Sequence, residues 1–221
     1  MGLFVLNTLI TKKPKIMKNK IIIGLIALGF ILPVASCKKG ENDPLLSLRS
    51  RKGRISGEWV LESKESALIE TVPNLGTFSS TSKYSNGIYS VFTTDFDGST
   101  YNDNYAYSYN LNVEKSGSFE SFEQSEDESQ TINGYWAFLP RNKEAELKNK
   151  EALLFSINKE LNISGSFSSS INFTNKGLNP SAVYVIDRLT NKEMVLKIEE
   201  IYNTSDGGSS SLKETLTFKA K

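Results

Sequence analysis

The chain contains no histidine and only one cysteine, Cys37, among its 221 residues. Without histidine there is no imidazole base for a Ser-His-Asp or Cys-His catalytic unit, and no histidine ligand for zinc or haem. A single cysteine excludes an internal disulfide framework and any thiolate cluster. Proline is scarce, at six residues, and no segment has the apolar periodicity of a long amphipathic helix. We therefore expect no catalytic residues, no metal site and no cofactor, and we expect the protein not to be an enzyme.

The first 36 residues are basic and apolar. They contain five lysines and no acidic residue, and an uncharged apolar run over 21–31 follows the last lysine. This run is shorter than the about 20 residues that a membrane-spanning helix needs, but it suits the core of a signal peptide. The sequence predicts a cleaved signal peptide over residues 1–36. Met17 is an alternative start, which would leave a compact basic leader before the apolar run.

The segment Val34-Ala35-Ser36-Cys37 resembles the lipobox of bacterial lipoproteins. In that family the cysteine is lipidated on sulfur, the signal is cleaved before it, and the new amino terminus is acylated. The resemblance implies that fatty acyl chains such as palmitate on Cys37 anchor the protein to a membrane of the cell envelope, with the outer membrane favoured. Each buried CH₂ contributes about 0.8 kcal/mol, and two or more chains give stable anchoring. An ordinary secretory signal with an incidental cysteine is the alternative.

Residues 37–54 are interpreted as the lipidated cysteine and a flexible tether, because the first half is polar and contains Gly and Pro. The basic cluster 49–54 either binds anionic groups on a membrane surface or is a solvated segment before the first strand; we favour the second. Removal of residues 1–36, with their five lysines, changes the formal charge from +1 to −4. A mildly acidic protein is a poor candidate for nucleic-acid binding, so we expect none.

From residue 55 onward, the residue composition and the pattern of apolar segments are those of a β protein. Tyr (9) and Phe (12) are plentiful, and short apolar segments recur with turn residues between them. The sequence predicts one all-β domain over residues 55–221, an antiparallel barrel of about eight to ten strands. Three polar stretches are predicted to be long loops, over residues 74–86, 123–130 and 158–180. Apolar residues on either side of the Ser-rich centre of the third suggest a weak hairpin as the alternative.

Two Gly-X-Trp motifs occur in the chain. Gly57-Glu58-Trp59 stands at the head of the first predicted strand, and Gly134-Tyr135-Trp136 repeats the pattern. The segments 184–189 and 192–196 look like two late strands that pair with each other. With the lipobox, these motifs make the chain similar to the lipocalin-like lipoproteins of Bacteroidetes bacteria. The resemblance implies a lipocalin-like barrel closed at one end by Gly57, Trp59, Gly134, Trp136 and an arginine, for which Arg188 is the candidate.

The same family suggests a location. In some relatives a lysine and acidic residues just after the lipidated cysteine direct export to the cell surface, and Lys38, Lys39, Glu41 and Asp43 resemble that signal. Surface display and the periplasmic face of the outer membrane therefore both stay open.

Tyrosines alternate along one predicted strand, at positions 101, 105, 107 and 109. If they face the interior, Tyr105, Tyr107 and Tyr109 line a cavity with apolar walls and polar tips, suited to an amphipathic ligand. If they face outward, they could stack on sugars or on another protein. The third interpretation is that they only pack the sheet, because Tyr favours strands.

Two functions follow from these features. The first is a membrane-anchored lipoprotein whose barrel binds a small apolar or amphipathic ligand without catalysis. The alternative is a structural or assembly lipoprotein that docks to an envelope complex through its rim, its loops or a strand edge. Acids near Asp95 and Asp97 could serve glycoside hydrolysis or bind calcium, but Asp97-Gly98 is more typical of a β-turn.

Overall fold

The computed structural model describes residues 49–144, 146–173 and 181–221. The predicted signal peptide, Cys37 and most of the predicted tether lie outside these ranges. The chain divides into two units, 1–37 and 38–221, and only the second contains described residues. Within the described residues, no helix has both the length and the apolar character needed to cross a bilayer.

The described residues form one short helix and eleven strands. The elements are, in chain order, α2 (Arg51–Ile55), β1 (Gly57–Val72), β2 (Gly76–Ser85), β3 (Ile88–Thr94), β4 (Thr100–Val113), β5 (Ser118–Ser125), β6 (Glu128–Phe138), β7 (Ala152–Ser164), β8 (Phe167–Asn172), β9 (Ser181–Leu189), β10 (Glu193–Asn203) and β11 (Ser209–Ala220). The prediction of an antiparallel all-β barrel is therefore confirmed.

Ten of the strands close into a ring. Each strand pairs antiparallel with the next from β1 to β7, then β7 pairs with β9, and β9, β10 and β11 lead back to β1. Strand β8 is additional and pairs with β7. Closure satisfies the edge groups that an open sheet would expose.

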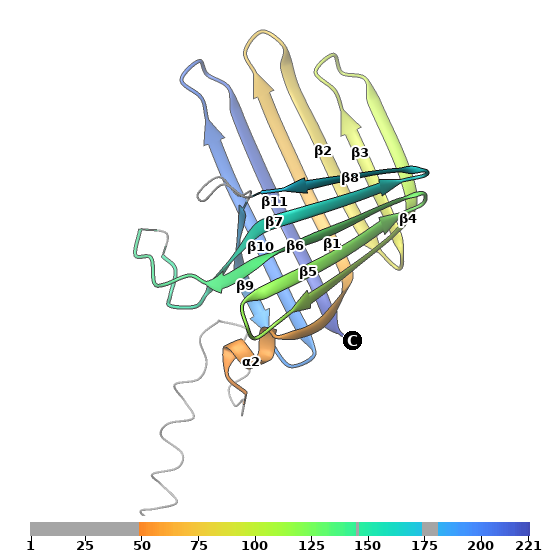
Figure 1. Cartoon of the computed structure of the whole chain (residues 1–221). Helices are drawn as coiled ribbons and strands as arrows, with labels where there is room; N and C mark the ends of the chain where they lie inside the picture. The colour runs from red at the N-terminus through yellow and green to blue at the C-terminus, as the bar shows by residue number, and fades with distance from the viewer. Residues whose placement is uncertain (1–48, 145, 174–180) are drawn as a thin grey trace, which may run out of the picture. The chain divides into compact units, whose positions relative to one another are not determined.

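One end of the ring is narrower than the other. Gly57–Val60 of β1 pairs directly with Asn110–Val113 of β4, which bypasses the β2–β3 hairpin. We call this end the base and the opposite end the mouth. Toward the mouth the sheet divides into two walls, because β4 pairs with β5 only from Tyr107 onward. Figure 1 shows β5–β8 crossing in front of the wall formed by β1–β3, β10 and β11.

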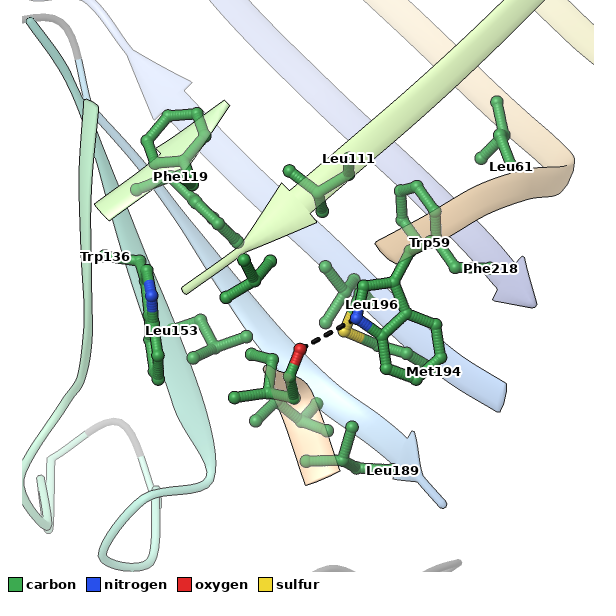
Figure 2. Close-up of a cluster of buried hydrophobic side chains, with 14 of the residues drawn as sticks. Trp59, Leu61, Leu111, Phe119, Trp136, Leu153, Leu189, Met194, Leu196 and Phe218 are labelled. Carbon is green, nitrogen blue, oxygen red and sulfur yellow. Dashed lines mark hydrogen bonds between the residues drawn. The ribbon is translucent and has the colours of Figure 1, made fainter. Parts of the chain in front are cut away.

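The hydrophobic core fills the base (Figure 2). Its most deeply buried large side chains come from seven elements and are Ile55, Trp59, Val113, Leu153, Leu189, Met194, Leu196 and Phe218. Burial of a side chain of this size stabilises the fold by about 1.5–3 kcal/mol. Every strand pairs with other strands of the 57–220 segment, and the core lies within residues 55–218. Residues 38–221 therefore contain the whole barrel, and we expect this fragment to fold by itself.

Three predicted loops are largely strands. Residues 76–85 form β2, 128–130 begin β6, and the 158–172 part of the third stretch is the end of β7 followed by β8. The hairpin alternative for the third stretch is thus confirmed, while residues 174–180 lie outside the described residues. The loop predictions failed because Ser- and Thr-rich strands that are polar on both faces lack apolar alternation, yet their backbones pair as well as any other.

The basic cluster before β1 belongs to the folded domain, contrary to both interpretations of it. Arg51 and Arg54 are 5% and 3% exposed and lie on helix α2. Arg54 Nη1 donates to the carbonyl oxygen of Leu189 at 2.6 Å, and Arg51 donates to the carbonyl of Lys150. The predicted boundary at residue 55 is therefore too late, since the arginines dock α2 onto neighbouring strand and loop backbone.

Candidate functional site

A cavity of about 250 Å³ lies above the core, inside the barrel. Its walls are mostly apolar side chains from both walls of the barrel, among them Leu111, Phe119, Ile132, Phe155, Leu196, Leu216 and Phe218. Four polar side chains also line it, namely Tyr109, Ser121, Ser181 and Tyr184. Apolar walls with a few polar groups are typical of small-molecule sites.

The tyrosines of β4 lie on the inner face. Tyr109 lines the 250 Å³ cavity, and Tyr107 and Tyr105 follow at two-residue steps toward the mouth. This is the geometry of alternation along a strand, in which residues i and i+2 share a face. Tyr101, by contrast, is 61% exposed. The structure thus places the three predicted residues inside the barrel, and whether they contact a ligand stays a prediction.

A layer of polar side chains covers the cavity on the mouth side. We call Lys64, Tyr107, Glu123, Tyr184 and Glu214 the polar layer, and they surround a smaller space of about 110 Å³. The Lys64 ammonium pairs with Glu214 at 2.8 Å, and Tyr184 Oη donates to Glu214 at 3.2 Å. Tyr107 Oη donates to Glu123 at 2.6 Å. Each buried polar group in the layer therefore has a partner.

Burial and pairing shift the titration of these groups. Burial raises the pKa of Tyr109 to about 12, because the phenolate would lose solvation. Burial, with a hydrogen bond to Glu123, also raises the pKa of Tyr107. Burial is the largest single influence on the pKa of Lys64 and lowers it, but the charge of Glu214, the hydrogen bond to Glu214 and the contact with Tyr89 together outweigh burial, so the pKa is raised. At neutral pH the tyrosines are thus neutral donors and Lys64 is a cation.

The mouth is a polar cleft of about 380 Å³ above this layer. It shares Lys64, Tyr107 and Glu123 with the 110 Å³ space, which in turn shares Tyr109 and Tyr184 with the apolar cavity. The three spaces therefore succeed one another from mouth to core.

Amide side chains form the opposite wall of the mouth. Gln130 donates to Glu160 at 2.9 Å and to Asn162 at 2.8 Å, while Asn162 donates to Glu160 at 2.7 Å. Ser164 Oγ donates to Glu128 at 3.0 Å. The amide donors are thus directed to neighbouring side chains, and acceptor oxygens predominate in this wall.

A larger hollow of about 590 Å³ lies outside the barrel, on the outer face of β1–β3, β10 and β11. Exposed ion pairs flank it, Lys83–Glu65 at 3.3 Å and Lys213–Glu199 at 2.7 Å. Such pairs contribute little energy and are screened by salt. We therefore place the candidate site inside the barrel.

The residues predicted to close one end of the barrel lie largely at the base. Trp59 is 2% exposed, and its indole Nε1–H donates to the Ile55 carbonyl at 2.7 Å, the bond dashed in Figure 2. Trp136 is buried as well, and its Nε1–H donates to the Glu114 carbonyl at 2.9 Å. Gly57 is exposed at the step from α2 into β1, where its φ of +150° suits glycine. Both Trp residues therefore join two elements at the base.

Gly134 allows close approach of two strands. A Cβ at this position would lie 2.1 Å from the Ser156 carbonyl oxygen and 2.6 Å from the Phe119 ring. The register shifts between Asn133 and Gly134 where β6 pairs with β7. Only glycine fits there without moving the backbone.

Arg188 does not close the base as expected. It is exposed, and its Nε pairs with Glu193 at 3.1 Å on the outer face. The two residues flank the β9–β10 turn, which brings the opposite charges together. The arginine buried at the base is Arg54, which donates to the Leu189 carbonyl. Sequence reasoning had placed Arg54 in the tether.

The acidic alternatives are less well supported by the geometry. Asp97 accepts hydrogen bonds from the backbone N–H and hydroxyl of Ser99, and Gly98 N donates to the Asp95 carbonyl at 2.9 Å. This is the predicted β-turn. Within the described residues, no group of three or more Cys, Asp or Glu side chains is arranged to hold a metal ion.

Comparison with known proteins adds no relative. No family model matches this chain, and no curated protein or solved structure matches it either.

Sequence reasoning missed four members of the polar layer, namely Lys64, Glu123, Tyr184 and Glu214. Lys64 and Glu214 lie on β1 and β11, the first and last strands of the barrel, which pair with each other. Glu123 was assigned to an acidic loop, although it continues the alternation of Phe119 and Ser121 on β5. That alternation was the available signal for an inward-facing carboxylate.

Proposed function

We propose that this chain is a membrane-anchored lipoprotein whose barrel binds a small apolar or amphipathic ligand and carries out no chemistry on it. The observation that carries the proposal is the 250 Å³ apolar cavity with a polar layer at its mouth side. An apolar part of a ligand fits the cavity, and a polar part reaches the side chains of the layer. Apolar cavities of only about 150 Å³ already bind molecules as small as benzene.

Anchoring rests on the sequence alone. The signal peptide and the lipobox ending at Cys37 support a lipidated amino terminus in the cell envelope, with the outer membrane favoured. The test is the intact mass of the protein isolated from membranes, which should begin at Cys37 and include acyl chains. A Cys37→Ser variant should leave the membrane fraction, and equal membrane retention of this variant would contradict the proposal.

The binding proposal is tested on residues 38–221, which lack the lipid. We expect a native mass spectrum of the gently purified fragment to show a bound small molecule, which organic solvent extracts. Ser121 is 3% exposed and lines the cavity, so Ser121→Phe should fill the space and remove the bound mass. If the unaltered fragment and Ser121→Phe both show only the mass of the protein, and no compound in a small-molecule screen binds either one, the result would count against ligand binding.

The second candidate function is docking to an envelope complex. Strand β8 pairs only with β7 among the described residues, and its Phe167 and Ile171 are 82% and 47% exposed. An unpaired edge with exposed apolar residues is suited to adding a strand from a partner. If Phe167→Lys abolishes co-purification of an envelope protein while ligand binding stays intact, docking is the function.

A further inference from the structure

The two carboxylates of the polar layer are not equivalent. Glu214 accepts a hydrogen bond from Tyr184 and pairs with the Lys64 ammonium. Glu123 accepts from Tyr107, a neutral donor, and within the described residues no basic side chain forms an ion pair with it. The layer thus contains two acidic groups and one basic group, and Glu123 is the one without a counter-ion.

Aromatic faces adjoin this carboxylate. The rings of Tyr89 and Tyr107 lie 5.2 Å apart, and those of Tyr89 and Tyr105 lie 5.4 Å apart. The Lys64 ammonium already lies over the Tyr89 ring, 5.7 Å from its centroid. The negative faces of such rings attract cations, and more strongly where water is partly excluded. A positive group beside Glu123 would gain from both the charge and the rings.

We propose that the ligand is an amphipathic cation, with an apolar tail in the 250 Å³ cavity and a primary ammonium group that donates to Glu123. The inference rests on the proposed function, since it concerns the head group of the ligand bound at the same site. A carboxylate head would meet Glu123 and Glu214 with only Lys64 to offset them, which disfavours fatty acids. A neutral hydroxyl would gain a hydrogen bond without the charge.

The tail is short. At about 30 Å³ for each water in the liquid, the cavity has the volume of about eight waters, so a chain of about eight carbons is a suitable probe. Octylamine, 1-octanol and octanoate share this tail and differ only in the charge of the head group.

The experiment is calorimetric titration of residues 38–221 with each of these three probes at pH 7, below their aggregation concentrations. We expect octylamine to bind at least tenfold more tightly than octanol, and octanoate to bind most weakly. Glu123→Gln should weaken octylamine at least tenfold and leave octanol unchanged. The matched control is Glu120→Gln, the same charge change on the exposed face of β5, which should alter none of the affinities.

The outcomes separate the two proposals. If octanol or octanoate binds as tightly as octylamine, the cationic head group is refuted while ligand binding stands. If Glu120→Gln weakens octylamine as much as Glu123→Gln does, the attraction is a general surface effect and the assignment to Glu123 is refuted. If none of the three probes binds, the proposed function fails and this inference fails with it. Should Glu123→Gln not fold, the ranking of the three probes on the unaltered fragment still decides the head-group charge.

Discussion

Replacement of Gly134 by alanine tests the packing of the base most directly. The new Cβ would lie 2.1 Å from the Ser156 carbonyl oxygen, whereas real Cβ contacts are essentially never shorter than 3.0 Å, so β6 and β7 must separate by about 0.9 Å. The Phe119 ring must move as well, because it would lie 2.6 Å away. Weakened strand hydrogen bonds cost about 1 kcal/mol each, and overpacking costs about 1–3 kcal/mol.

We therefore expect Gly134→Ala to lower the free energy of unfolding by about 2–4 kcal/mol. In a domain of this size the change lowers Tm by about 10 °C. Urea titration followed by circular dichroism of residues 38–221 measures the difference. Gly87→Ala is the control, since its Cβ would meet nothing within 4 Å and only its φ of +82° is unfavourable, at about 1–2 kcal/mol.

The double variant Gly134→Ala/Phe119→Leu isolates the contact with the ring. A leucine leaves room for the new methyl group, so the double variant should lose less stability than the sum of the two single losses. A Gly134→Ala protein within about 0.5 kcal/mol of the unaltered fragment would refute the claim that close strand approach requires glycine here.

Three further predictions concern charged and titrating groups. Burial raises the pKa of Tyr109 to about 12, above the value near 10 of a tyrosine in the unfolded chain. The resulting stabilisation of the fold, about 3 kcal/mol, is complete below pH 10 and is lost as the pH rises toward 12. Tyr109→Phe should flatten this decline of the unfolding free energy with pH, as measured by urea titration. Arg54→Ala should cost about 2–3 kcal/mol in the same assay because it removes a buried charged donor, whereas exposed Lys115→Ala should cost under about 0.5 kcal/mol. Lys64→Met should lower the free energy of unfolding by about 2 kcal/mol, because Glu214, 12% exposed, keeps its charge without a cation. The double variant Lys64→Met/Glu214→Leu removes both charges and should have nearly the stability of the unaltered fragment. A double variant less stable than the single one would contradict this.

Local patterns predicted the class of fold and that the tyrosines of β4 share one face, while the direction of that face stayed open until the structure placed it inside the barrel. Tyr105, Tyr107 and Tyr109 alternate with the small residues Ala106 and Ser108, and a strand with that pattern turns its aromatic side inward when one side is buried. The two tryptophans were also predictable, because a large apolar side chain beside glycine at a strand end is suited to closing a barrel. In each case the information lies within a few neighbouring residues.

The remaining features depend on contacts between distant segments. Lys64 and Glu214 are 150 positions apart, and only the closure of β11 onto β1 brings them together. Likewise, the sequence indicated Arg188 for the base, whereas the folded chain exposes Arg188 beside the β9–β10 turn and buries Arg54 against the Leu189 carbonyl. Strand β2 lacked a signal altogether, since its Ser and Thr residues face both sides with similar polarity.

The candidate ligand site lies between the core and the mouth, and the two share wall residues, namely Leu111, Phe119, Phe155, Leu196 and Phe218. The β1–β4 pairing closes the base without β2 and β3, and the β2–β3 hairpin contributes Tyr84 to the core and Tyr89 beside it. Buried ion pairs seldom stabilise a fold more than apolar side chains of the same size would. The lysine, two glutamates and two tyrosines of the polar layer are therefore not explained by stability. These side chains are explained if the barrel distinguishes ligands by the charge of their head groups. Apolar side chains cannot do this, because they carry neither charge nor hydrogen-bonding groups.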